Sequence, residues 1–98
     1  MAALHLIAQS PDQGSAFRNC LRAAAPGDTV LLIGNGVYCG TDSRIAPRGR
    51  ATSITWCALS ADVAARAIGA QLREHVKQID DDAFVALVAS HLPIVSWS

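Results

Sequence analysis

The chain has 98 residues and a mass of 10.3 kDa, which is enough for one compact domain and too short for two. Hydrophobic residues make up 51% of it and charged residues only 16%, which excludes disorder and predicts a core, with part of the surface buried against partner chains. Eight basic and eight acidic residues cancel, so no basic field is available to hold nucleic acid or an anionic membrane.

The sequence shows no targeting or membrane segment. The N-terminal stretch has no basic region, and His5 interrupts its apolar run. No apolar run approaches the roughly 18 residues of a membrane helix. The cysteines Cys20, Cys39 and Cys57 are odd in number and too widely spaced for a disulfide framework or a zinc motif. We therefore expect a cytoplasmic protein with reduced thiols and without a metal.

Short apolar runs alternate with helical patterns along the chain, which is typical of an α/β layer fold. Ser10-Pro11 ends the first apolar run, and Ser60 and Gly69 are suited to the N-cap and C′ positions of a helix. In chain order, the patterns predict strand 4–7, helix 14–25, strand 29–33, a turn at 34–36, a short helix over 37–40, a polar surface loop over 41–52, strand 53–57, helix 61–68, strand 76–79, a helix that begins at the three aspartates 80–82, and strand 94–97.

This order predicts a three-layer α/β/α sandwich with a central, mainly parallel sheet of about five strands, in a single domain that spans residues 1–98. The near-continuous apolar run 29–33 supports a parallel sheet, because such strands are covered on both faces. Ligand chemistry in these sheets gathers at the carboxyl ends of the strands. We expect Ser10, residues 34–36 and Cys57 at those ends.

Cys20 is the candidate reactive residue. Sulfur chemistry needs a thiolate, which a nearby cation, a helix N-terminus or a metal normally generates. Cys20 falls in the middle of the predicted helix, and the residues three and four positions away include no base. Two alternatives stay open: Cys20 is a small packed hydrophobe at the edge of the buried face, or it is a reactive thiol whose activating partner comes from a loop or another chain.

The remaining candidates favour structural interpretations. We expect Cys39 and Cys57 to be buried, and His5 to be a core histidine that is hydrogen-bonded. His75 and His91 lie near the ends of elements without a neighbouring carboxylate for acid–base work, and the three histidines lack the helical spacing of metal ligands.

Two loops carry weaker signals. The glycines of 34–40 resemble a dinucleotide loop, but they follow the second strand and lack a ribose-binding acid, so a tight turn with positive φ is the alternative. The arginines of 41–52 either grip an acidic partner or RNA, or belong to a solvated loop: Arg44, Arg48 and Arg50.

An ordered series of short motifs resembles the DsrH/TusB family of sulfur-relay subunits. The resemblance covers nearly the whole chain, although no single motif is diagnostic. The motifs are Leu4-His5-Leu6 before Ser10-Pro11, Asn19-Cys20-Leu21-Arg22, Gly27-Asp28, the run 30–33, Asn35-Gly36-Val37-Tyr38, Leu59-Ser60-Ala61-Asp62-Val63 with Ala65-Arg66, Ile79-Asp80 before Phe84-Val85, and Val95-Ser96-Trp97.

The resemblance implies a DsrE/F/H-like fold and a cytoplasmic heterohexamer with TusC/TusD-like or DsrE/DsrF-like subunits. One branch of the family passes persulfide sulfur toward 2-thiolation of the wobble uridine in tRNA, and the other serves dissimilatory sulfur oxidation. The main sulfur-carrying cysteine is then expected on a partner chain. Cys20 matches a cysteine position of the DsrH branch, which makes it a possible persulfide carrier.

The implied chemistry needs no organic cofactor or metal, and no direct contact with nucleic acid or membrane is expected. A purely structural subunit of the same heterohexamer is the alternative to an active carrier. The chain departs from the family at Gly34 and Asn35, where an acidic residue often stands, and at Cys39, where a small residue often stands.

Overall fold

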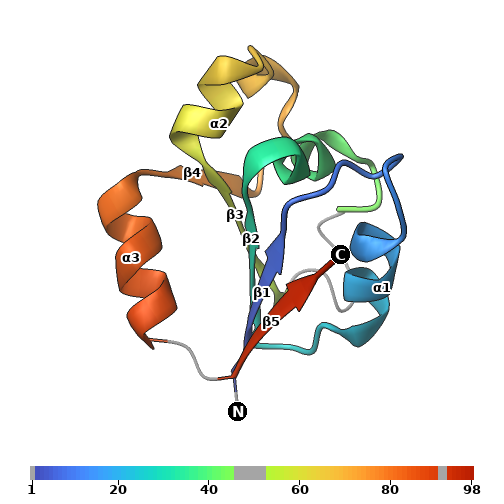
Figure 1. Cartoon of the computed structure of the whole chain (residues 1–98), viewed down its shortest axis with the longest axis vertical. Coiled ribbons are helices and arrows are strands. Elements are labelled where there is room, and N and C mark those ends of the chain that lie inside the picture. The colour runs from blue at the N-terminus through green and yellow to red at the C-terminus, as the bar shows by residue number, and fades with distance from the viewer. Residues whose placement is uncertain (1, 46–52, 91–92) are drawn as a thin grey trace.

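A five-stranded parallel sheet forms the centre of the computed structural model, which describes residues 2–45, 53–90 and 93–98 (Figure 1). The strands lie in the order β4-β3-β2-β1-β5. The chain steps outward from β1 to β4 and then returns to the other side of β1, so the winding reverses between β1 and β5. The strands are β1 (Leu4–Ile7), β2 (Thr29–Leu32), β3 (Thr55–Leu59), β4 (Val76–Ile79) and β5 (Ile94–Trp97).

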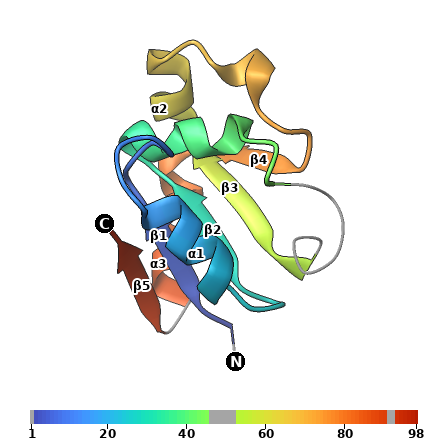
Figure 2. The ribbon, with the colours of Figure 1, turned by 90° about the vertical axis from the view of Figure 1, so that its right-hand side faces the viewer.

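Helices cover both faces of this sheet, which confirms the predicted three-layer sandwich. Figure 2 shows α1 (Ala16–Ala23) in front of the strands and α3 (Asp81–Ser90) behind them. The 3₁₀ helix η1 (Gly34–Thr41) and α2 (Ser60–Ala65) contribute buried side chains to the same side as α1. A second 3₁₀ helix, η3 (Gly69–Gln71), lies between α2 and β4.

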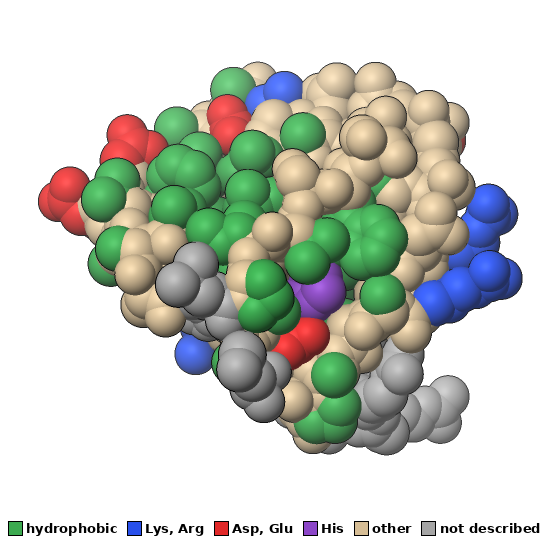
Figure 3. Space-filling view, turned by 60° about the horizontal axis from the view of Figure 1, so that its bottom comes forward, with side chains coloured by type: hydrophobic (Ala, Val, Ile, Leu, Met, Phe, Trp, Pro, Cys, Tyr) green, Lys and Arg blue, Asp and Glu red, His purple; other side chains and the backbone are tan. Residues whose placement is uncertain are grey.

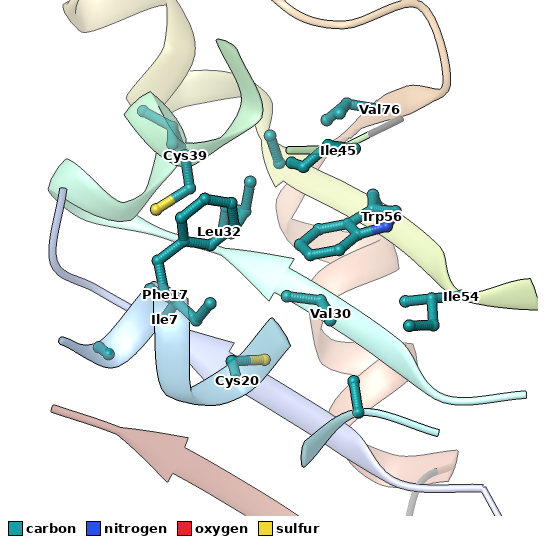
Figure 4. Close-up of a cluster of buried hydrophobic side chains, with 14 of the residues drawn as sticks. Ile7, Phe17, Cys20, Val30, Leu32, Cys39, Ile45, Ile54, Trp56 and Val76 are labelled. Carbon is teal, nitrogen blue, oxygen red and sulfur yellow. The ribbon is translucent and has the colours of Figure 1, made fainter. Parts of the chain in front are cut away.

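The larger core lies between the sheet and α1. Alternate strand residues point into it, since successive side chains of a strand face opposite sides. Phe17 of α1 meets Trp56 of β3 edge to face, with ring centroids 6.1 Å apart and an interplanar angle of 73°, the arrangement that aromatic pairs prefer (Figure 4). Both side chains are only 1% exposed, and burying each contributes about 2 kcal/mol or more.

The smaller core lies under α3. Leu4, Leu31 and Cys57 are its buried residues, and Phe84 and Leu87 of α3 pack against them. No residue of α3 is itself buried, although its sequence is mostly apolar. This side of the protein therefore leaves large hydrophobic side chains in solvent.

The third strand begins two residues later than predicted. The backbone N–H of Thr55 donates to the carbonyl of Asp28, and the parallel ladder with β2 starts at the pair Thr29 and Thr55. Cys57 consequently lies in the middle of β3, opposite Leu31, and the expectation that it marks a carboxyl end is wrong.

The ends of α2 also differ from the prediction. Ser60 is the first helical residue, so Leu59 occupies the N-cap without a side-chain hydrogen bond. At the other end the left-handed residue is Ala67, with φ of 52°, and not Gly69. The N–H of Ala67 donates to the carbonyl of Ala64, and that of Ile68 to the carbonyl of Val63, which together form a Schellman motif. These bonds and the packing of Ile68 offset the cost of about 1 kcal/mol for a left-handed alanine.

The remaining differences concern boundaries and one loop. The predicted helix 14–25 is observed as the shorter α1, because residues 10–13 form a turn in which the N–H of Gln13 donates to the carbonyl of Ser10. The predicted turn and short helix merge into η1. Ile45, expected in the surface loop 41–52, is fully buried in the larger core, and residues 46–52 of that loop lie outside the described residues.

Candidate functional site

Cys20 lies in the middle of α1, with its side chain wholly inside the larger core. Its exposed fraction is 0%, and Figure 4 shows it beside Val30 and below the ring of Phe17. Burial, together with the smaller effect of the nearby carboxylate of Asp28, raises the pKa of the Cys20 thiol to about 12. The helix thus places Cys20 deeper than the edge position that its spacing predicted, as a neutral and shielded thiol.

The other two cysteines are buried as predicted. Cys39 of η1 is 0% exposed, and its thiol donates a hydrogen bond to the backbone carbonyl of Gln9 with an Sγ–O distance of 3.4 Å. Burial, together with the smaller effect of the charge of Asp42, raises the pKa of Cys39 to about 12. Burial also raises the pKa of Cys57, which faces α3. All three thiols therefore stay protonated near neutral pH.

His5 is the hydrogen-bonded core histidine that the sequence predicted. Its Nε2 lies 2.8 Å from Oδ2 of Asp28, and its Nδ1 accepts a hydrogen bond of 3.0 Å from the indole N–H of Trp97. The imidazole and the indole also stack, with centroids 6.1 Å apart and planes 18° apart. Because an indole nitrogen only donates, Nδ1 is the acceptor and the neutral ring carries its proton on Nε2.

Asp28 is the residue that analysis of the sequence missed. Besides the contact with His5, its carboxylate accepts hydrogen bonds from the backbone N–H groups of Ala3 and Ala25, each at 3.0 Å. Burial alone would raise the pKa of Asp28, but these hydrogen bonds and the contact with His5 together hold it below the usual value. The motif Gly27-Asp28 singles out this aspartate in the sequence, but the motif does not indicate that the carboxylate pairs with His5.

The glycine-rich segment 34–40 forms most of the 3₁₀ helix η1, and hydrogen bonds join it to α2 and the residue that follows α2. Gly34 adopts a positive φ of 53°, as the alternative to a dinucleotide loop predicted. Its N–H donates to the carboxylate of Asp62 at 2.8 Å, and the guanidinium of Arg66 donates two hydrogen bonds to Oδ1 of Asn35, at 3.0 and 2.9 Å. The first amide of this segment already faces a carboxylate, which would repel a phosphate group.

An open hollow of about 450 Å³ lies beside this turn, next to the carboxyl ends of β1 and β2. Asp42 at its rim forms an ion pair of 2.9 Å with Arg44, whose guanidinium also sits 4.8 Å above the ring of Phe17. Arg44 is thus engaged with its own chain, and Arg48 and Arg50 lie outside the described residues. Polar side chains line the hollow: Ser10, Asp12, Gln13, Asn35, Thr41 and Asp42.

The residues considered as metal ligands do not converge. Within 2–45, 53–90 and 93–98, no three His, Cys, Asp or Glu side chains come close enough together to hold an ion. His75 borders a smaller hollow of about 290 Å³ and has no hydrogen-bond partner at either ring nitrogen in the described structure. His91 lies outside the described residues.

Arg66→Ala is expected to lower the free energy of unfolding by about 1 kcal/mol, because it removes the two hydrogen bonds to Asn35 and a third to the carbonyl of Asp62 at the joint between α2 and η1. Chemical denaturation measures the change. The matched control is Arg18→Ala, which changes an exposed arginine of α1 and is expected to stay within about 0.5 kcal/mol. Equal losses in the two variants would contradict the proposed joint.

None of the helices in the part of the chain that the structure describes has both the length and the apolar character that crossing a membrane requires.

Comparison with known proteins gives a consistent family. The family model described as "DsrH like protein" matches residues 9–93. "Protein TusB" of Salmonella paratyphi B is 32% identical over 85 residues, which cover 86% of this chain and 90% of the relative. "Protein TusB" of Salmonella arizonae is 32% identical over 82 residues, or 83% of this chain and 86% of the relative.

A solved structure supports the fold. The solution NMR structure of protein Tm0979 from Thermotoga maritima superposes with a TM-score of 0.66 at 24% sequence identity, and the match covers 89% of this chain and 91% of the other. The family match begins two residues after β1 and ends at the residue before β5, so it spans every element between these two strands. The chain therefore belongs to the DsrH/TusB family of sulfur-relay subunits.

Proposed function

We propose that this protein is the TusB-type subunit of a cytoplasmic sulfur-relay complex. The complex passes persulfide sulfur between protein thiols toward 2-thiolation of the wobble uridine in tRNA, and TusC/TusD-type subunits complete it as a heterohexamer. The identity of 32% with proteins named TusB over most of both chains supports this assignment. The second candidate is a DsrH-type subunit in sulfur oxidation, which the position of Cys20 favours.

The subunit itself acts structurally, and the sulfur-carrying cysteine belongs to a partner chain. The observation that carries this conclusion is the complete burial of Cys20. Sulfane sulfur moves when a thiolate attacks the outer sulfur of a persulfide, so a carrier thiol must be both accessible and ionised. Cys20 is neither, because burial raises its pKa to about 12 and the helix turns it into the core.

The exposed surface supports a role within an assembly. Val85 and Val88 of α3 are 63% and 36% exposed, and Ile94 of β5 is 38% exposed. Figure 3 shows hydrophobic side chains gathered on the side of the protein that is turned forward in that view. A surface with large apolar side chains and few charges is typical of a subunit that is covered by others.

The experiment that tests the proposal replaces Cys20 by alanine in the reconstituted complex with TusC/TusD-type partners. Sulfur transfer from a persulfide donor is expected to stay within about twofold of the wild-type rate, because alanine keeps an apolar side chain in the core and no sulfur passes through this position. Cys57→Ala, which changes a buried thiol on the opposite face, is the matched control. Loss of transfer beyond tenfold in Cys20→Ala alone, with the complex intact by gel filtration, would show that Cys20 carries sulfur.

Mass spectrometry gives a direct second reading. After incubation with a persulfide donor, the assembled complex is expected to show the addition of about 32 Da on a partner cysteine and none on the peptide that contains Cys20. Alkylation of Cys20 is expected only after denaturation. A persulfide on Cys20 in the native complex would contradict the structural role and show that this subunit carries sulfur.

The pathway is tested in the cell. Deletion of the gene for this protein is expected to lower the fraction of 2-thiolated wobble uridine in tRNA, measured by nucleoside mass spectrometry, and the Cys20→Ala gene is expected to restore it. Unchanged thiolation together with slower sulfur oxidation would favour the second candidate.

A further inference from the structure

The C-terminal strand is fastened to the sheet by one buried polar contact. β5 is a strand of four residues at the edge of the sheet, and among the described strands it pairs with β1 alone. Trp97, at its end, packs against the larger core and donates its indole N–H to Nδ1 of His5 at 3.0 Å. His5 is 4% exposed, so this hydrogen bond is made away from water.

The bond to Trp97 requires one protonation state of His5. The neutral ring protonated on Nε2 donates to Asp28 and accepts from Trp97, which satisfies both partners. When His5 gains a proton, Nδ1 becomes a donor, and two N–H groups then face each other across 3.0 Å. The contact with Asp28, in contrast, becomes stronger on protonation, because the positively charged imidazolium is attracted to the carboxylate.

Ionisable side chains lie on several of the elements packed around His5. Asp28, in the turn before β2, has a lowered pKa and remains a carboxylate, and the raised pKa of Cys20 on α1 keeps that thiol neutral. Arg18 and Arg22 of α1 are exposed, and β5 carries no ionisable side chain. Histidine is the side chain that ordinarily changes charge between about pH 5 and 8.

We infer that His5 and Trp97 form a pH-sensitive latch on β5: protonation of His5 releases the indole and loosens β5 while Asp28 keeps β1 joined to the turn before β2. The latch does not depend on the proposed function, since it follows from contacts within the chain. Release frees the edge of β1 and uncovers the part of the larger core that Trp97 shields.

The test measures backbone amide exchange by NMR in the full 98-residue chain from about pH 8 to about pH 5, with protection factors corrected for the intrinsic pH dependence of exchange. The protection of β5 is expected to fall about tenfold in the range in which the His5 ring signals report protonation. The protection of β2 and β3 is expected to stay constant over the same range, because their ladders do not involve Trp97.

Trp97→Phe separates the latch from general acid destabilisation. Phenylalanine preserves the ring stack over His5 and lacks the N–H donor, so β5 is expected to exchange faster at pH 8 and to show no further step on acidification. The latch is overturned if His5 protonates while β5 remains protected, if Trp97→Phe keeps the pH step, or if His5 stays neutral until the whole chain unfolds.

Discussion

Asp28→Ala is expected to lower the free energy of unfolding by about 4 kcal/mol, which is a large share of the total stability of a domain of this size. The carboxylate accepts three hydrogen bonds, from the N–H groups of Ala3 and Ala25 and from Nε2 of His5. Removing it leaves three donors without a partner at a site that is 4% exposed. Each stranded donor costs about 1–3 kcal/mol.

Urea denaturation at neutral pH, followed by circular dichroism, measures this loss. Asp12→Ala is the matched control, since Asp12 is an exposed carboxylate that accepts a hydrogen bond from the hydroxyl of the nearby Ser10. The control is expected to change the free energy of unfolding by less than about 1 kcal/mol. If Asp28→Ala were as stable as the control, the buried carboxylate would not be the joint between β1 and the turn before β2.

The lowered pKa of Asp28 also sets a direction for the effect of pH on stability. A carboxyl whose pKa is lower in the folded than in the unfolded state stabilises the protein above the unfolded value, and this contribution is lost as the pH falls through the folded value. The wild-type protein is therefore expected to lose stability below about pH 4 more steeply than Asp28→Asn, which has no carboxylate to protonate at this site.

The layered fold was predictable because its signals are local. Apolar runs such as 29–33 mark buried parallel strands, and the alternation of strands and helices leaves few topologies open. The Schellman motif after α2 was not predictable in the same way. A left-handed alanine at position 67 is disfavoured locally, and only the packing of Ile68 and the two hydrogen bonds to the last turn of α2 make it stable.

The polar contacts at the candidate site escaped prediction because they join residues far apart in the chain. Asp28 lies 23 residues from His5, and Trp97 lies 92 residues from it. The sequence identified His5 as a core histidine from its apolar neighbours, yet pairing it required the sheet order that brings β5 and the turn before β2 to either side of β1. The depth of Cys20 also depends on this arrangement, since the core in which it is buried is built from residues of β1, β2, β3, β4, η1 and α2 as well as α1.

Gly36→Ala is expected to lower the free energy of unfolding by about 3 kcal/mol, the upper range for overpacking a site whose neighbours cannot move aside. A Cβ at Gly36 would overlap the carbonyl oxygen of Ile7 at the end of β1. That oxygen accepts the N–H of Ile33 at 3.0 Å, so moving it aside breaks a bond between β1 and the residue after β2. The cost arises from backbone, which has no alternative rotamer.

Gly69→Ala is the control for this substitution, because a Cβ there meets Gln78 Nε2 and Val63 Cγ1 only at 3.7 and 3.8 Å, which are ordinary contacts. Thermal and urea unfolding of the two variants should differ by more than about 2 kcal/mol. Gly36→Ala is also expected to disturb the polar hollow, since residues of η1 and of the loop 10–13 after β1 line it together. If the two alanines had equal effects, the close approach of η1 to β1 would not constrain position 36, and the glycine in the motif Asn35-Gly36 would need another explanation.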